Sequence, residues 1–246
     1  MKDNFSKVAN LYSQFRPSYP AALFDFLIPL VHSRKIAWDA GTGNGQIASE
    51  LANYFEKIFA TDLSEKQIKN AIIRKNIIYK VEKAEQTTFG DNEFDLITVA
   101  QAIHWFDFSK FYAEVKRTLK PEGIIAVIGY GLCIIDQKAD KIIDHLYSNI
   151  LNSYWDEERK YIDEHYKTIP FPFIEIPTPA FKSVYDWNLE QLIGFLNSWS
   201  AVQHYKDRNN NENPLDEIIN NLRSCWQENE KKKVSFPAFL RVGKKS

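Results

Sequence analysis

The sequence predicts an α/β protein built on a doubly wound, mostly parallel sheet. Two observations lead to this fold class. A glycine-rich turn over 39–45 follows the apolar run 36–38 and precedes a helical pattern. Apolar runs then alternate with helical patterns as far as residue 128. Strands that alternate with helices favour right-handed crossovers and therefore parallel neighbours in one sheet.

The glycine-rich turn reads D-x-G-x-G-x-G, with Gly41, Gly43 and Gly45 directly after Asp39. Glycine is needed where a backbone turns sharply or lies against a ligand without an intervening Cβ atom. In open α/β sheets, a strand followed by a glycine-rich loop and a helix commonly forms the nucleotide-binding site. A pyrophosphate-binding loop would read G-x-G-x-x-G, so this spacing departs from the dinucleotide pattern. A tight turn that binds nothing is the alternative reading.

A second acidic residue, Asp62, ends the β-rich run 57–61. An acid about twenty residues beyond such glycines is placed to bind both ribose hydroxyls of an adenosine ligand. Ser64 and Gln67 form an S-x-x-Q capping box, which predicts a helix immediately after Asp62. The alternative is that Asp62 binds no ligand and only stabilises the N-terminus of the following helix.

The run 94–100 is unbroken and apolar, as expected for a strand buried on both faces of a parallel sheet. Gln101, His104 and Trp105 follow it, at the edge where ligands lie in open α/β sheets. The other elements expected after the glycine loop are strands over 77–81, 124–128, 181–187 and 234–242 and helices over 108–119, 139–150 and 189–196.

Composition bounds the possible functions. A chain of 246 residues with net charge -1 suits one α/β domain and lacks the basic excess typical of nucleic-acid binding. Cys133 and Cys225 are the only cysteines, so neither a disulfide frame nor a zinc site is expected. No signal peptide or membrane-spanning run is evident, which predicts a cytoplasmic protein. The expected organisation is a single domain with an N-terminal segment over 1–34, a nucleotide-binding core over 35–130, an insertion over 131–180 and closing elements over 181–246.

Three motifs carry a family resemblance. The loop D-x-G-x-G-x-G resembles motif I of class I S-adenosylmethionine (SAM) methyltransferases. The run YSQFRPSYP over 12–20 resembles the N-terminal cap of the type-11 group of that family. The run His104-Trp105-Phe106 resembles the motif that follows the fourth strand in the same group. Over nearly the whole chain, the sequence is most similar to trans-aconitate methyltransferase-like members.

The resemblance implies a seven-stranded sheet with an N-terminal cap over 1–34 and a helical, substrate-selecting lid over 131–180. It also implies SAM as cofactor and roles for particular residues, and no metal is expected. His104 is the candidate base or hydrogen-bond donor to the substrate. The implied substrate residues are Arg16, His104, Trp105 and Trp199. The implied cofactor residues are Tyr12, Arg16, Asp39, Ala40, Gly41, Thr42, Gly43, Gly45, Asp62, Leu63, Ala84, Glu85 and Gln101.

The acceptor is less well defined. Enzymes that methylate base amines in nucleic acids usually carry an N-P-P-Y motif after the fourth strand, and the run VAQAIHWF lacks it. The resemblance therefore favours a small acceptor such as a carboxylate, with Arg16 available to hold an anion. An NAD-dependent oxidoreductase, a non-catalytic SAM-binding or interaction protein, and a protein or tRNA methyltransferase remain alternatives. The sequence does not define the oligomeric state.

Overall fold

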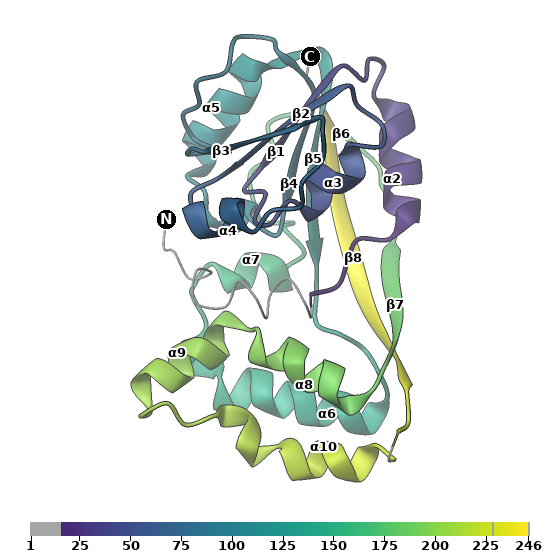
Figure 1. Ribbon diagram of the computed structural model, residues 1–246, viewed down its shortest axis with the longest axis vertical. Coiled ribbons are helices and arrows are strands. Elements are labelled where there is room, and N and C mark those ends of the chain that lie inside the picture. The colour runs from purple at the N-terminus through teal and green to yellow at the C-terminus, as the bar shows by residue number, and fades with distance from the viewer. Residues whose placement is uncertain (1–15, 228, 246) are drawn as a thin grey trace.

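The computed structural model describes residues 16–227 and 229–245 and has one mixed sheet (Figure 1). The parallel strands are β1 (Ile36–Ala40), β2 (Lys57–Asp62), β3 (Ile77–Val81), β4 (Phe94–Ala100) and β5 (Leu119–Tyr130). The strand order β3-β2-β1-β4-β5-β8-β6 places β1 and β4 at the centre. The order reverses beside β1, which is the position where open α/β sheets bind ligands.

The antiparallel edge explains why eight strands fill seven positions. Strand β8 (Lys232–Lys244) pairs antiparallel with β5. On its other side, β6 (Ile174–Ile176) and β7 (Phe181–Trp187) lie end to end along β8. The gap between them contains Pro177 and Pro179, which cannot donate backbone hydrogen bonds to the sheet. The predicted doubly wound, mostly parallel sheet is confirmed.

Strand β5 is longer than the predicted strand over 124–128. Helix α5 (Phe108–Thr118) ends directly at the strand, whose first residue Leu119 already pairs with Phe94. The register shifts before Leu96 pairs with Ile124, so a bulge contains Pro121 and Gly123. The predicted helix over 108–119 and strand over 124–128 leave these two residues in a connection, but in the structure they belong to an irregularity within the strand.

Helices cover both faces of the sheet, and each face has its own core. Helices α2 (Ala21–Leu27) and α3 (Gln46–Leu51) pack on the face reached by Ala37. Helix α5 packs on the opposite face, reached by Trp38 (Figure 1). Successive strand residues point to opposite faces, so both neighbours on β1 are fully buried.

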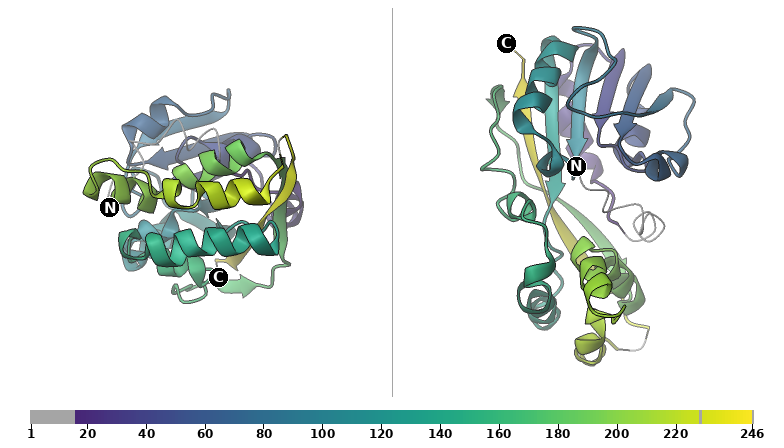
Figure 2. Two further views of the ribbon diagram at one scale, coloured as in Figure 1. Left: turned by 90° about the horizontal axis from the view of Figure 1, so that it is seen from below. Right: turned by 90° about the vertical axis from the view of Figure 1, so that its left-hand side faces the viewer.

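A group of helices lies beyond the carboxyl ends of the parallel strands (Figures 1 and 2). Its longer members are α6 (Gln137–His145), α8 (Leu189–Asn197), α9 (Ser200–Arg208) and α10 (Ile219–Cys225). Strands β7 and β8 extend from the sheet to this group. Between the sheet and the group lies the short helix α7 (Arg159–Asp163), so the carboxyl edge of the sheet is covered.

The remaining short elements join these parts. They are the 3-10 turns Ile28–Leu30, Ile103–Trp105, Asn152–Tyr154 and Pro214–Glu217, and the helix α4 (Glu65–Lys69). The single helix predicted over 139–150 is wrong in detail, because α6 ends at His145 and continues as a π-helical turn over Leu146–Ile150. Such a turn changes the direction of the following side chains and is frequent at functional sites. Within the described residues, every helix is too short or too polar to cross a membrane.

Candidate functional site

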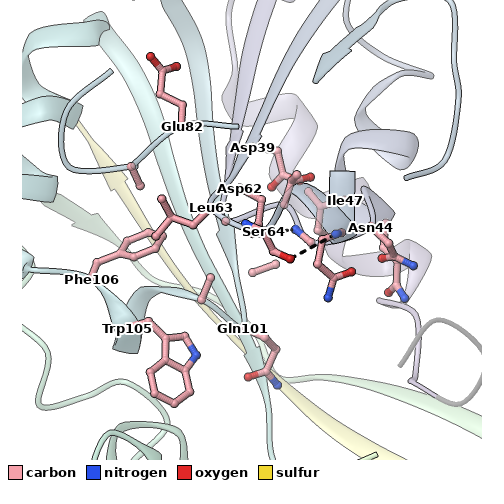
Figure 3. A pocket seen from close by; sticks show the side chains of 18 of the residues that line it. Asp39, Asn44, Ile47, Asp62, Leu63, Ser64, Glu82, Gln101, Trp105 and Phe106 are labelled. Atoms are coloured by element: carbon pink, nitrogen blue, oxygen red, sulfur yellow. Dashed lines mark hydrogen bonds between the residues drawn. The ribbon is translucent and has the colours of Figure 1, made fainter. Parts of the chain in front are cut away.

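A cleft of about 1020 Å³, part of it open to solvent, lies at the carboxyl ends of β1, β2 and β4. Figure 3 shows Asp62 near its middle, between Trp105 and Phe106 on one side and Asn44 and Ile47 on the other. The complete lining is Tyr19, Asp39, Gly41, Thr42, Gly43, Asn44, Gln46, Ile47, Asp62, Leu63, Ser64, Gln67, Glu82, Ala84, Ala100, Gln101, Ala102, Trp105 and Phe106.

The glycine loop leaves room for a ligand at one position. Gly43 and Gly45 have φ angles of +57° and +83°, in the left-handed region that favours glycine. A Cβ atom added at Gly43 would have no heavy atom within 4 Å, whereas one added at Gly45 would lie 2.1 Å from Tyr79 Oη. Gly43 therefore borders open space in the cleft, while Gly45 is required by packing.

This difference predicts unequal stability losses for two similar variants. Gly45→Ala should lower the free energy of unfolding by about 3 kcal/mol, because it adds overpacking to left-handed strain. Gly43→Ala should cost only about 1–2 kcal/mol, from the strain alone. Urea unfolding measures both. Removing the Tyr79 hydroxyl in a Gly45→Ala/Tyr79→Phe double variant should give less than the sum of the single losses. Equal losses for the two alanine variants would contradict this account.

The carboxylate of Asp62 connects the glycine loop to the segment after β2. Its Oδ2 accepts a hydrogen bond from the Gly43 backbone N–H at 2.8 Å, and its Oδ1 accepts one from the Ser64 N–H at 2.8 Å. The capping box predicted at Ser64 is only half formed, because the Ser64 N–H donates to Asp62. The Ser64 hydroxyl still accepts from the Gln67 N–H at 3.3 Å.

Gln67 is thereby left facing the cleft. Its side chain is only 3% exposed, and its Oε1 has no hydrogen-bond partner among the described residues. Buried polar atoms without partners are costly and rare in folded proteins. An oxygen acceptor in this state, in the cleft that Asp62 also lines, fits a site that receives hydroxyl or amino groups of a ligand.

A second cavity, of about 510 Å³, lies against the helical group. Three tryptophans, Trp105, Trp155 and Trp199, contribute to its walls. Its other lining residues are Arg16, Gln101, His104, Asp156, Arg159, Ile162 and Ser200. Gln101 and Trp105 line both cavities, so the two meet at the end of β4.

The backbone at this junction is strained. Gln101 has a φ of +51°, which costs a residue with a side chain roughly 1–2 kcal/mol. Two hydrogen bonds hold it there: its N–H donates to Ile128 O at 2.9 Å, and its Nε2 donates to Tyr130 O at 2.9 Å. Strain of this kind is concentrated at ligand sites, where it fixes the direction of a side chain.

Comparison with known proteins shows the family of this chain. The model of a methyltransferase domain matches residues 38–127. A Dictyostelium discoideum protein named as a methyltransferase is 32% identical over 99% of this chain and 95% of its own length. The chain belongs to the SAM-dependent methyltransferases.

Solved structures extend the comparison to the fold. A type II methyltransferase from Anaeromyxobacter dehalogenans superposes with a TM-score of 0.86 at 36% identity, over 94% of this chain and 98% of that one. The YcgJ protein of Bacillus subtilis shares the fold with a TM-score of 0.54 at 18% identity, over 92% of this chain and 99% of that one. The methyltransferase uses SAM as its cofactor, and the NAD-dependent alternative is set aside.

The cleft of the methyltransferase contains a buried aspartate, Asp39, with a raised pKa. Asp39 is 1% exposed and accepts hydrogen bonds from Thr42 Oγ1 at 2.5 Å and from Thr98 Oγ1 at 2.8 Å. Burial raises the pKa of Asp39 to about 6, although both threonine hydrogen bonds oppose that shift. The carboxylate is therefore charged at neutral pH and becomes protonated in mild acid.

This pKa predicts how cofactor affinity depends on pH. By the family resemblance, we expect Asp39 to lie near the amino-acid end of the cofactor, whose ammonium group would bind the charged carboxylate better than the neutral acid. The affinity for S-adenosylhomocysteine (SAH) should therefore fall as pH drops below about 6 and reach roughly tenfold loss by pH 5. Calorimetry between pH 5 and 8 measures it. Asp39→Asn should remove the dependence, and a wild-type affinity unchanged over this range would place the ammonium elsewhere.

His104 is 5% exposed in the second cavity, and its Nδ1 lies 3.0 Å from the Tyr166 hydroxyl. Burial, and then the nearby charge of Arg159, lower the pKa of His104 to about 3. The imidazole is therefore neutral at physiological pH. A neutral imidazole with so low a pKa is a weak base, but it remains a hydrogen-bonding group fixed by Tyr166.

The predicted site residues divide between the two cavities. Tyr12 lies outside the described residues. Arg16 lies at the second cavity, where its Nη1 donates to Tyr130 Oη at 3.1 Å and its Nη2 to Ser198 O at 3.1 Å. Trp199 lines the same cavity. The predicted residues that line the first cleft are Asp39, Gly41, Thr42, Gly43, Asp62, Leu63, Ala84, Gln101 and Trp105.

Three predicted residues stand outside the cleft lining. Ala40 and Gly45 belong to the backbone behind it. Glu85 accepts a hydrogen bond from the Asp107 N–H at 3.2 Å, and its neighbour Ala84 reaches the cleft instead. Sequence reasoning missed Gln67 as a lining residue, because the capping-box pattern assigned its side chain to the helix terminus. It also missed Arg159, which lies in a segment without a recognisable motif.

Proposed function

We propose that this methyltransferase methylates a small anionic molecule, a carboxylate in the simplest case, which binds in the second cavity. The observation that supports this is the junction of the two cavities at Gln101 and Trp105. Small-molecule sites are concave and largely apolar, with a few placed polar groups, and this cavity has such walls. Three tryptophans with a few polar groups are also typical of such sites.

The cofactor fits the first cleft. Asp62 would hold the ribose, Gly43 lets the ligand approach the backbone, and the buried Gln67 Oε1 offers an acceptor. Bound SAM would supply an electrophilic methyl group. The acceptor oxygen would provide the electron pair of the new O–C bond, and the sulfur of SAM would keep the pair of the broken S–C bond. A carboxylate loses no proton in this transfer.

The tasks left to the protein are alignment and exclusion of water. Gln101 is held rigidly at the junction by its two hydrogen bonds. Trp199 and Ser200, where helix α9 begins, line the second cavity. His104, which is neutral, would donate or accept one hydrogen bond at the acceptor, and no step requires it to hold a proton.

The direct test is methyl transfer from isotopically labelled SAM to a panel of small acids, phenols and amines, with products identified by mass spectrometry. We expect methyl esters of acids to dominate. A phenol or amine product would correct the acceptor class. SAH binding without transfer to any member would support the non-catalytic alternative. Transfer only to protein or tRNA substrates would overturn the small-molecule assignment.

A further inference from the structure

We infer that Arg159 is the residue that recognises the anionic group of a planar, unsaturated or aromatic acceptor. This inference rests on the proposed function and makes its substrate class more specific. Arg159 begins α7, between the sheet and the helical group, and lines the second cavity together with His104. No sequence motif points to it.

The Arg159 side chain is held in one orientation. Its Nε donates to Tyr147 Oη at 2.9 Å and lies 3.4 Å from Asp163 Oδ1. The Tyr147 hydroxyl in turn donates to the Asp163 carboxylate, at 2.7 Å from Oδ1. Tyr147 belongs to the π-helical turn, so the departure from the predicted straight helix occurs beside this arginine. A fixed side chain binds a ligand at a lower entropic cost.

Aromatic rings support the guanidinium. Its Cζ lies 4.8 Å from the centroid of the Trp155 ring and 5.3 Å from that of Tyr147. Trp155 is fixed by a hydrogen bond from its Nε1 to Tyr147 O at 3.1 Å. Arginine stacks on aromatic faces while keeping its hydrogen-bonding edge available. The stack therefore leaves that edge for a ligand.

The terminal nitrogens of Arg159 form the available binding fork. Neither Nη1 nor Nη2 makes a hydrogen bond with any of the described residues, the ion pair with Asp163 has its shortest contact at Nε, and the side chain is 19% exposed. Two parallel N–H groups match the two oxygens of a carboxylate, and such charge-assisted pairs are about twice as strong as neutral ones. A partly buried arginine with this fork unused is suited to an anionic ligand.

The surrounding walls restrict the shape of that ligand. Trp155 and Trp199 have ring centroids 5.5 Å apart and both line the cavity. Trp105 lines it at the junction with the cofactor cleft. Flat aromatic walls make their largest contact with a planar group, by offset stacking or edge-to-face packing. A planar acid fills both the apolar and the charged parts of the cavity.

Other charged groups at the cavity determine where an anion can lie. Two donors of Arg16 are used by Tyr130 and Ser198, so this arginine joins the N-terminal segment to the core. Asp156 contributes a carboxylate whose side chain is 8% exposed, and it would repel an anion. Arg159 is therefore the favoured anchor, and a cationic ligand would favour Asp156 instead.

The test uses three planar probes of nearly equal size, with the protein saturated with SAH: trans-cinnamate, trans-cinnamamide and cinnamylamine. Calorimetry should show cinnamate binding at least tenfold more tightly than the amide, with the amine weakest. Arg159→Gln should abolish the preference for cinnamate over the amide and leave SAH affinity unchanged. Arg159→Lys, which retains the charge but lacks the fork, should keep only part of the preference.

Two variants serve as controls. Arg208→Gln removes another arginine stacked on a tyrosine, 5.4 Å from the Tyr154 ring and outside the cavity, and should change nothing. Arg16→Gln should weaken all three probes similarly, since it alters the wall. The inference is overturned if Arg16→Gln alone removes the preference, if cinnamylamine binds best, or if no probe binds while SAH does. If the wild-type protein does not bind SAH at all, the proposed function itself is contradicted.

Discussion

Replacement of Asp62 by alanine should weaken SAH binding roughly 10- to 150-fold. The expected loss follows from removing a carboxylate that holds the two ribose hydroxyls, because hydrogen bonds to charged groups contribute about 1.5–3 kcal/mol. Isothermal titration of purified wild type and variant measures it. A variant with wild-type affinity would remove Asp62 from the cofactor site.

Asp62 also accepts hydrogen bonds from the backbone of Gly43 and Ser64, so its loss disturbs the loop as well. A pair of ligands separates the two effects. For 5′-methylthioadenosine, Asp62→Ala should cost most of the affinity. For the 2′,3′-dideoxy analogue, which lacks both hydroxyls, the same substitution should cost little. Equal losses with both ligands would indicate that Asp62 acts only by shaping the loop.

Replacement of His104 by alanine should reduce turnover roughly 10- to 100-fold, because small misplacements of reacting groups have effects of that size. SAH affinity should change little, since His104 lines the second cavity and is absent from the lining of the first. With SAM saturating, so that the titration of Asp39 does not limit cofactor binding, the turnover of the wild type should lack an inflection near 6.5, because the pKa of His104 is about 3.

His204→Ala is the matched control for His104. His204 lies in the helical group, where its Nδ1 is 2.9 Å from Tyr154 O, and it lines neither cavity. Its loss should leave turnover unchanged. If His104→Ala lowered SAH affinity and turnover by the same factor, the histidine would be structural. A kinetic inflection that moved on replacing His104 would show that it titrates during catalysis.

The sequence was sufficient to predict the fold because its signals are local. Alternation of apolar runs with helical stripes predicts a parallel sheet, and the glycine spacing after Asp39 locates its ligand edge. The positive φ angles at Gly41, Gly43 and Gly45 agree with glycine being required there. These features depend on residues close together in the chain, so no tertiary contact is needed to read them.

The details that escaped sequence reasoning depend on contacts between distant segments. The hydrogen bond between the Ser64 N–H and Asp62 replaces half of the capping box and leaves Gln67 in the cleft. Arg159 is oriented by Tyr147, twelve positions earlier, and approaches His104, which follows β4. Neither segment has a pattern that predicts this meeting, because it arises where the helical group packs against the sheet.

The most direct test of the two-cavity account is a crystal structure of the protein with SAH. The account predicts that the ribose hydroxyls contact the Asp62 carboxylate and that the sulfur lies at the junction of Gln101 and Trp105, facing the second cavity. A structure with SAH outside the cleft, or with its sulfur turned away from that junction, would contradict it.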